Sequence, residues 1–400
     1  MAFARRRVLR AVVVMAALLH VSVPASVAAQ DEPAAPQTVT AAQLQDAIDK
    51  LGSLEYSTRT AASRLVRRTA PAQAVPALLT TVAEHADGYV RYRALVLLTG
   101  FNDPRTRDAM RESLASPNDR LRTVAYSYFE HNPNAALVPS LLEALDRESA
   151  EFVRPALIRA LAAHASDPQV PPVLVREAGR GEDFFRSVVI EALGDYKAAY
   201  ALQALLAIAE QDGPLIDDVA LALGKIGRPE ALATLAGLQR TAPRPTQPFI
   251  AAGICLLGTN CASHEHYLTE SLKFGDQNIG FQELLRGAAT GLGALGVAGR
   301  ASAIEALFET GIPSRDPTRA PVALALATVA LRNTPAMLDT LKGLGDRGAA
   351  LDLLAEGFDM LEEDLEKERF FALVRRTFWT SPEGSVDRAL MQALIGKLDF

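Results

Sequence analysis

Apolar residues recur along most of this chain at the spacing of an α-helix. From residue 54 onward, a basic or aliphatic residue is followed by a small or aliphatic residue three positions later and by an apolar pair six and seven positions later. The stretch Arg91, Ala94, Leu97 and Leu98 is typical. Offsets of three, six and seven place side chains on one face of a helix, so each occurrence predicts an amphipathic helix with one buried face.

The pattern occurs nine times at a nearly constant interval of 30 to 35 residues. That interval is the length of two helices joined by a turn, and a second apolar run such as residues 75–82 follows the first helix. One helical hairpin cannot bury both of its apolar faces, so the hairpins must stack on one another. We call the first residue of each occurrence its anchor and expect the arginine anchors to be structural. The anchors are Arg59, Arg91, Arg122, Arg154, Arg186, Ile216, Ile250, Leu285 and Arg319.

Glycines and acidic residues mark the expected helix ends. Four glycines follow the first helix of their hairpins, where a residue that tolerates positive φ ends a helix at low cost. They are Gly194, Gly224, Gly258 and Gly293. Acidic residues three or four positions before an anchor, such as Asp87 and Asp183, can cap the incoming helix. The anchor arginine one turn later can pair with that acid or with an acid of an adjacent hairpin.

These repeats resemble HEAT repeats, in particular the bacterial HEAT-like kind that also occurs in relatives of phycobilisome lyases. The resemblance covers about residues 54 to 345 and rests on segments 90–91, 153–157, 191–194 and 222–227. It implies an all-α fold, an α-solenoid of about nine HEAT-like helical hairpins with a divergent C-terminal cap. Family members are usually curved scaffolds that hold partner proteins. A lengthened unit at residues 244–280 departs from the pattern and puts uniform curvature in doubt.

The two ends of the chain do not follow the repeat. Residues 1–29 resemble a cleavable signal peptide, because four arginines precede an apolar stretch that ends in small residues. Residues 30–40 are expected to be a flexible linker. The repeat solenoid then takes residues 41–347. Residues 348–400 lose the register and carry bulky aromatic side chains, so we expect a C-terminal helical cap that covers the last apolar face.

Composition agrees with a helical protein and argues against some partners. Hydrophobic residues make up 49% of the chain and aromatic residues only 6%, which is little for a sandwich or barrel. Removal of the signal peptide leaves 37 basic and 47 acidic residues, a net charge of −10. Nucleic acid would be repelled by that charge. We expect a periplasmic or secreted protein with no nucleic-acid partner and no integral membrane span in the mature chain.

Two cysteines and two histidines lie close together in the lengthened unit. Cys255 and Cys261 are the only cysteines of the chain, and an oxidising compartment favours a disulfide that would staple the long loop there. Two unpaired cysteines are the alternative. A zinc site that adds His264 and His266 is a weaker hypothesis, because structural zinc commonly uses two well-separated ligand pairs.

Catalytic signatures are few. The pair His264-Glu265 resembles those that bind a di-iron centre in HEAT-like deoxyhypusine hydroxylases, but the further pairs on successive repeats are missing. A metal-dependent enzyme would need additional acids such as Asp276 or Glu283. Residues 291–296 have the spacing of a dinucleotide fingerprint, yet they follow a helix pattern and not a strand. We therefore predict no catalytic residue, no cofactor and no resident metal.

The functional hypothesis is an exported, non-enzymatic scaffold that binds a protein or peptide through its solenoid surface. We expect the second helices of the hairpins to line the concave face. The alternative is an accessory or regulatory subunit of an envelope enzyme or transporter complex, and a metal-dependent enzyme is the third hypothesis. Tyr92 and Tyr126 are candidate partner contacts, because tyrosine is favoured in binding hot spots, with core packing as the ordinary alternative.

Overall fold

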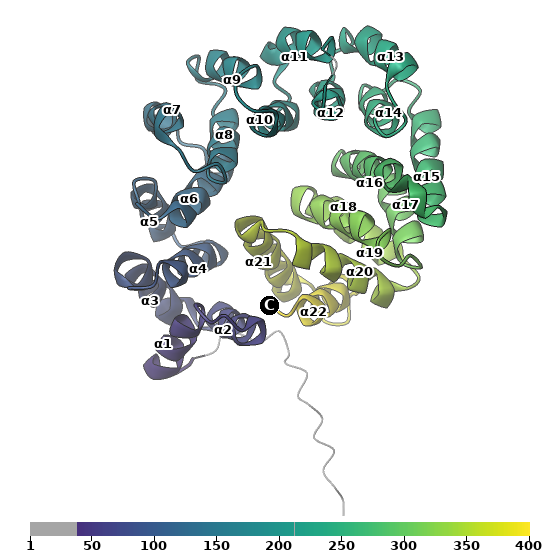
Figure 1. The fold of residues 1–400 in the computed structure, drawn as a ribbon. Coiled ribbons are helices and arrows are strands. Elements are labelled where there is room, and N and C mark those ends of the chain that lie inside the picture. Colours follow the sequence, from purple (N-terminus) through teal and green to yellow (C-terminus); the bar gives the residue numbers. More distant parts are fainter. Residues whose placement is uncertain (1–37, 212) are drawn as a thin grey trace, which may run out of the picture. The chain divides into compact units, whose positions relative to one another are not determined.

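A computed structural model describes residues 38–211 and 213–400, and Figure 1 shows them as an array of paired helices. The expected signal peptide, residues 1–29, and most of the expected linker, residues 30–37, lie outside the described residues. The described part contains twenty-two α-helices and four short 3-10 helices and no β-strand. The predicted fold class, an all-α solenoid of helical hairpins, is confirmed.

The helices are arranged in an outer and an inner layer (Figure 1). The outer layer comprises α1 (Ala41–Lys50), α3 (Pro71–Glu84), α5 (Arg105–Ser113), α7 (Val138–Arg147), α9 (Val170–Ala178), α11 (Leu202–Ala209), α13 (Ala231–Thr241), α15 (Cys261–Gln277), α17 (Ala301–Gly311) and α19 (Thr334–Gly343). The inner layer comprises α2 (Tyr56–Arg68), α4 (Gly88–Leu98), α6 (Asp119–His131), α8 (Arg154–Ala163), α10 (Asp183–Asp195), α12 (Ile216–Ile226), α14 (Gln247–Leu256), α16 (Gln282–Val297), α18 (Arg319–Arg332) and α20 (Arg347–Met360).

Two helices and four 3-10 turns complete the described part. Helices α21 (Asp364–Thr380) and α22 (Val386–Leu398) follow α20. The 3-10 helices are η1 (Thr99–Phe101), η2 (Ala135–Leu137), η3 (Ala199–Ala201) and η4 (Ile279–Phe281). Each of the four connects an inner helix with an outer helix.

Every anchored helix belongs to the inner layer. We expected the second helix of each hairpin to line the concave face, and this prediction was wrong, because helices such as α3 and α7 lie on the outside (Figure 1). The anchored first helices face inward. Their alanine and glycine positions let neighbouring inner helices approach closely, and the layer with the closer spacing lies on the inside of a curved stack.

Glycine permits this close packing, and three of the four glycines expected at helix ends lie within inner helices. Gly194, Gly224 and Gly293 were expected at helix ends but lie inside α10, α12 and α16. A Cβ atom on Gly224 would lie 2.6 Å from the Cα atom of Gly253 on α14. Of the four glycines only Gly258 has positive φ, 80°, just after α14. The sequence could not separate the two roles, because glycine suits both a close approach and a helix end.

The anchor arginines join each inner helix to the chain that precedes it. Arg91 Nε donates to the carbonyl oxygen of Val82 in the last turn of α3, at 2.7 Å. Arg319 Nη1 donates to the carbonyl of Gly311 at the end of α17, at 2.8 Å. The last carbonyls of a helix have no partner within that helix, so the guanidinium group satisfies them and complements the helix dipole. Contacts with backbone carbonyls are also made by Arg59, Arg122, Arg154 and Arg186.

The repeat continues one helix beyond the point where the sequence pattern was followed. Arg347 begins another stretch with the anchor offsets, which ends in Leu353-Leu354. Its Nη2 atom donates to the carbonyl of Lys342, near the end of α19, at 2.6 Å. Helix α20 packs against α18 as a tenth inner helix. The interval of 28 residues from Arg319 is shorter than the intervals of 30 to 35 residues between the other anchors.

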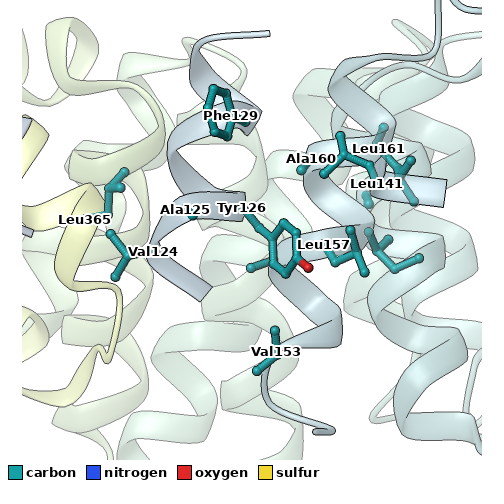
Figure 2. Close-up of a cluster of buried hydrophobic side chains, with 14 of the residues drawn as sticks. Val124, Ala125, Tyr126, Phe129, Leu141, Val153, Leu157, Ala160, Leu161 and Leu365 are labelled. Atoms are coloured by element: carbon teal, nitrogen blue, oxygen red, sulfur yellow. The ribbon is translucent and has the colours of Figure 1, made fainter. Parts of the chain in front are cut away.

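Two hydrophobic clusters form the core between the two layers, one in the N-terminal half of the described body and one in the C-terminal half. Figure 2 shows the section of the hydrophobic core at α6 and α8, where Tyr126 lies beside Leu157 and Leu161 lies beside Leu141. Leu365, from α21, reaches this section beside Val124 (Figure 2). Burial of these apolar faces against neighbouring hairpins is what stabilises the stack.

The C-terminal helices return to the N-terminal hairpins of the same body. Helix α21 contacts α4, η1 and α6, and ion pairs join α21 to α4 and α6. Arg67 Nε and Glu368 Oε2 lie 2.7 Å apart, and both side chains are buried. Arg93 Nη1 donates to Asp364 Oδ2 at 2.7 Å. We call this contact the seam; it joins Arg64, Arg67, Tyr92, Arg93 and His131 to Asp364, Leu365, Glu366, Glu368 and Asp399.

Candidate binding groove

A cavity of about 530 Å³ opens on the inner layer, lined by residues of α10, α12, α14, α16, α18 and α20. We call it the inner groove. Its apolar lining includes Leu221, Phe249, Val297, Leu324 and Met360. The side chains of Leu324 and Met360 remain 39% and 42% exposed. Large apolar side chains exposed inside a concave surface are typical of a binding site.

Small residues of the inner helices make room for this cavity. Ala222 on α12, Gly293 and Ala294 on α16, and Ala325 on α18 all line it. A Cβ atom on Gly293 would lie 3.3 Å from the Cβ atom of Ala325, so α16 and α18 approach closely there. The same pattern that allows the inner layer to pack thus leaves a hollow between the larger side chains.

Most charged residues of the groove are neutralised within the chain. Asp195 accepts hydrogen bonds from Lys225 Nζ at 2.7 Å and from Arg159 Nη1 at 2.9 Å. Arg286 Nη1 donates to Glu283 at 3.1 Å. Arg332, which also lines the groove, has its Nη2 atom 2.9 Å from a carboxylate oxygen of Glu363. These groups therefore have little unbalanced charge to offer a ligand.

Two acids of the groove have no such partner. Glu191 on α10 and Asp218 on α12 line the cavity, and neither forms an ion pair with another described residue. Burial raises the pKa of Asp218; a hydrogen bond with Ser187 and the charge of Lys225 oppose this rise, and the charge of Glu191 adds to it. Burial likewise raises the pKa of the neighbouring Asp217, to about 6. Burial disfavours the ionised form of Asp218, and a ligand cation beside it would favour that form.

The two tyrosines named as partner contacts do not offer free surface in this structure. Tyr126 lies in the core with 2% of its surface exposed (Figure 2), which agrees with the packing alternative. Tyr92 donates its hydroxyl hydrogen to Asp364 in the seam. Burial and the charge of Asp364 raise the pKa of Tyr92. Helical spacing alone could not predict the contact of Tyr92, because the seam joins residues about 270 positions apart.

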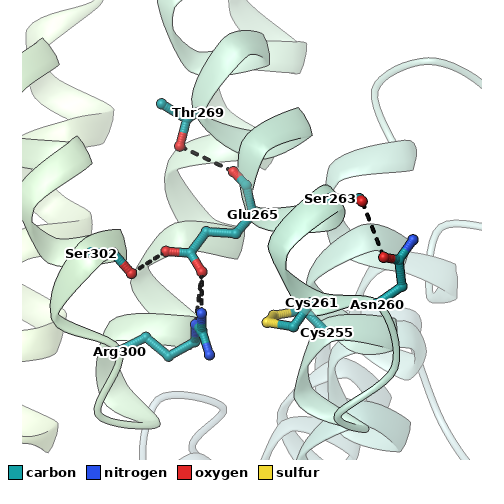
Figure 3. The surroundings of a disulfide bond; sticks show 8 residues. All are labelled: Cys255, Asn260, Cys261, Ser263, Glu265, Thr269, Arg300 and Ser302. Carbon is teal, nitrogen blue, oxygen red and sulfur yellow. Dashed lines mark hydrogen bonds and ion pairs between the residues drawn. A yellow bond between two sulfur atoms is a disulfide. The ribbon is translucent and has the colours of Figure 1, made fainter.

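Cys255 and Cys261 form a disulfide across the turn between α14 and α15 (Figure 3). Cys255 lies in the last turn of α14, and Cys261 is the first residue of α15. The segment that we expected to be a long loop is therefore mostly the helix α15, and the bond closes only a short turn. The departure from the repeat is an outer helix of seventeen residues.

The acids of the metal-dependent hypothesis are engaged by other side chains. Residues 264–266 lie near the start of α15, and the Glu265 carboxylate accepts hydrogen bonds from Arg300 Nε, at 2.8 Å, and from Ser302 (Figure 3). Asp276 accepts from two hydroxyl groups of the segment between α17 and α18. Glu283 is paired with an arginine one turn later. These carboxylates do not converge on the two histidines.

One other group of metal-ligand types lies at the seam. Glu130 and His131 of α6 and Glu366 of α21 bring three ligand atoms within 4.8 Å of one another. Arg159 Nε donates to Glu130 at 2.9 Å, and Arg369 Nη1 donates to Glu366 at 2.8 Å. A metal ion would compete with guanidinium groups that already neutralise both carboxylates, so this donor set does not fit one.

Comparison with known proteins gives no closer identification. No family model and no curated protein matches the chain. The chain is similar to the solved structure of Kap121p bound to RanGTP, at 12% identity over 88% of this chain and 44% of that chain, with a TM-score of 0.42. It is similar to Kap95p bound to RanGDP at 12% identity, over 89% and 56%, with a TM-score of 0.37. The complex of CpcE and CpcF of phycocyanin lyase from Nostoc sp. PCC7120 matches at 18% identity, over 82% and 96%, with a TM-score of 0.27.

The chain spans about half the length of the Kap121p and Kap95p chains that it matches. At these identities and TM-scores, no function passes from those proteins to this one. The class that the helix packing itself defines is an α-solenoid of helical hairpins, the architecture that the resemblance to HEAT repeats implies. No single helix in residues 38–211 and 213–400 is long and apolar enough to cross a membrane; α18 and α19 pass that test only as a pair, and they are bent by 119° at the break.

Proposed function

We propose that this chain is an exported, non-enzymatic scaffold that binds a protein or peptide segment in the inner groove. The observation that carries the proposal is that exposed apolar side chains and unpaired carboxylates share one cavity of the inner layer. Exposed apolar side chains cost free energy when they face water, and a bound partner would remove that cost. A solenoid suits this role because many shallow contacts accumulate along its inner face.

Export is part of the proposal. The arginines and the apolar stretch of residues 1–29 favour it. The disulfide between Cys255 and Cys261 agrees with it, because such bonds persist mainly in oxidising compartments. A C-terminally tagged chain should appear in the periplasm or the medium, and intact mass should show that residues 1–29 are gone. An unprocessed product in the cytoplasm would contradict export.

Affinity capture from the native envelope tests the binding role. The bait would be the whole chain, its groove variant Leu324→Asn, and the matched control Leu54→Asn, whose side chain is fully exposed outside the groove. The partner should be retained by wild type and control and lost with Leu324→Asn. Titration calorimetry with the purified partner should give similar affinities for wild type and control and a weaker affinity for Leu324→Asn. If all three baits retained the partner equally, the inner groove would not be its binding site.

The same capture separates a scaffold from an accessory subunit. Recovery of an enzyme or transporter whose activity changes when the chain is added would favour the accessory role. If capture returns nothing above background while the purified chain converts a small molecule, the scaffold role is wrong.

A further inference from the structure

The inner groove presents an apolar surface and an acidic surface, which favour different ligand groups. Leu324 and Met360 expose apolar area, whose burial requires an apolar group. Glu191 and Asp218 present carboxylates that can accept charge-assisted hydrogen bonds from a cation. Both kinds line one cavity of about 530 Å³, which falls within the range of about 300 to 1,000 Å³ found for pockets that enclose a ligand.

The basic groups around the two acids are committed elsewhere. Lys225 lies two turns after Asp218 on the same helix, but its Nζ atom donates to Asp195 at 2.7 Å. Arg286, from α16, donates to Glu283. The charge of Glu191 raises the pKa of Asp218 and that of Lys225 lowers it, and one further cation between the two acids would stabilise both carboxylates.

We propose that the inner groove recognises a peptide segment in which a leucine-sized apolar side chain lies next to a lysine or an arginine. The apolar side chain packs against Leu324 and Met360, and the cation lies between Glu191 and Asp218. This inference rests on the proposed function and adds the chemistry of the ligand. The acidic balance of the chain supports it, because a net negative protein attracts basic segments.

Matched fluorescent peptides test the pairing of charge with an apolar group. The first probe is a short peptide of alternating arginine–leucine pairs. In the second, glutamate replaces each arginine, and in the third, serine replaces each leucine. Fluorescence anisotropy with the whole chain should show binding of the first probe and affinities at least about tenfold lower for the other two. Binding of the first probe should weaken as salt is raised.

Charge-neutralising variants locate the cation. The double variant E191Q/D218N keeps the size of both side chains, and the control E305Q/E309Q removes two exposed acids of the outer helix α17. The groove variant should bind the arginine–leucine peptide about tenfold more weakly, the loss expected when a charge-assisted contact is removed. The control should bind like wild type, and circular dichroism should be the same for all three.

The outcomes separate this inference from the proposed function. If the glutamate peptide binds as well as the arginine peptide, or if E191Q/D218N has no effect, the cation requirement is wrong. The scaffold role still stands in that case if Leu324→Asn abolishes capture of the partner. Dodecylamine that binds in the groove as tightly as the peptide would assign the site to small amphiphilic amines and overturn the peptide ligand. If Leu324→Asn changes neither capture nor peptide binding, both proposals fail.

Discussion

Asp217 shows what burial without a counter-charge does to a carboxyl group. It lies in the first turn of α12, next to Asp218, and its Oδ1 atom is buried without a hydrogen-bond partner among the described residues. Burial raises its pKa to about 6; a hydrogen bond with Thr246 opposes this rise, and the charge of Asp218 adds to it. The start of α12 thus combines two half-buried acids, at a helix end that favours negative charge.

Asp217→Asn should stabilise the chain at pH 7.5. The folded pKa lies above the unfolded value of 3.8, so the ionised form costs stability above about pH 6 and no cost remains below pH 3.8. Discounted for solvent at this partly exposed position, the gain in the free energy of unfolding should be about 1 kcal/mol. Urea denaturation at pH 7.5 and at pH 3.5 measures it. A gain of equal size at both pH values would show that the charge is not the cause.

At the scale of the element, the inner layer depends on helices that approach closely at small residues. Gly224 of α12 faces the backbone of Gly253 on α14, and the added Cβ would lie 2.6 Å from both its Cα atom and its carbonyl oxygen. Gly237 of α13 is also inside a helix, but a Cβ there would meet only the end of one arginine side chain, at 3.9 Å. The two glycines therefore form a matched pair that differs in packing alone.

Gly224→Ala should destabilise the fold, whereas Gly237→Ala should stabilise it. The first change inserts a methyl group between two backbones, and overpacking of this kind costs about 1 to 3 kcal/mol. The second change removes the conformational freedom of glycine from a helix interior, which is worth about 0.5 to 1 kcal/mol. Thermal and urea unfolding of the two variants would measure both effects. If Gly224→Ala proved neutral, α12 and α14 could not lie as close as described.

The hydrophobic periodicity of the sequence predicted the inner helices but not the groove that these helices form together. The offsets from Arg59 to Arg319 identify the buried face of each inner helix, because that face obeys a spacing local in sequence. The groove depends on Glu191 and Leu324 lining one cavity although they are far apart in the chain. Glu191 lies within a segment that carried the resemblance to HEAT repeats, yet only the packed structure shows that it has no ion-pair partner. No local pattern contains that information.

At the scale of the whole described body, the seam differs from the other helix contacts in its chemistry. The buried hydrophobic cluster of the N-terminal half runs from Leu44 to Ile254 and includes one residue from the C-terminal helices, Leu365. The rest of the seam consists of ion pairs and hydrogen bonds, several of them buried. Glu368, with 1% of its side chain exposed, lies between Arg67 and Arg375, at 2.7 Å and 3.4 Å. Loss of one buried charge leaves its partners uncompensated.

Glu368→Gln should loosen the seam without unfolding the solenoid. Removal of one partner of a buried ion pair costs about 3 to 5 kcal/mol, and here the cost falls on the contact between α21 and α2. Hydrogen exchange followed by mass spectrometry should show faster exchange in α21, with little change in α12 and α14. Glu362→Gln, in the exposed acid just before α21, is the control and should exchange like wild type. If hydrogen exchange became faster by the same factor along the whole chain, the seam would not open independently of the rest of the fold.

Acidification should weaken the seam through Glu366. Burial raises the pKa of this carboxyl group, but the hydrogen bond and charge of His131, with Arg332 and Arg369, outweigh burial and hold the pKa at about 2. Because the folded value lies below the unfolded 4.5, the stabilising contribution is complete above pH 4.5 and is lost as pH falls through about 2. Glu366→Gln should therefore lower the free energy of unfolding at pH 6, and the difference from wild type should shrink steadily between pH 4.5 and pH 2.

Urea titrations of wild type and Glu366→Gln across that interval measure this difference, with Glu362→Gln as the charge-matched control. The control removes an exposed acid that has no ion-pair partner among the described residues, so its difference from wild type should stay near zero throughout. His131 Nε2 and Glu366 Oε1 lie 2.6 Å apart. If the difference for Glu366→Gln does not change with pH, the ion pair between these two side chains does not hold the two ends of the described body together.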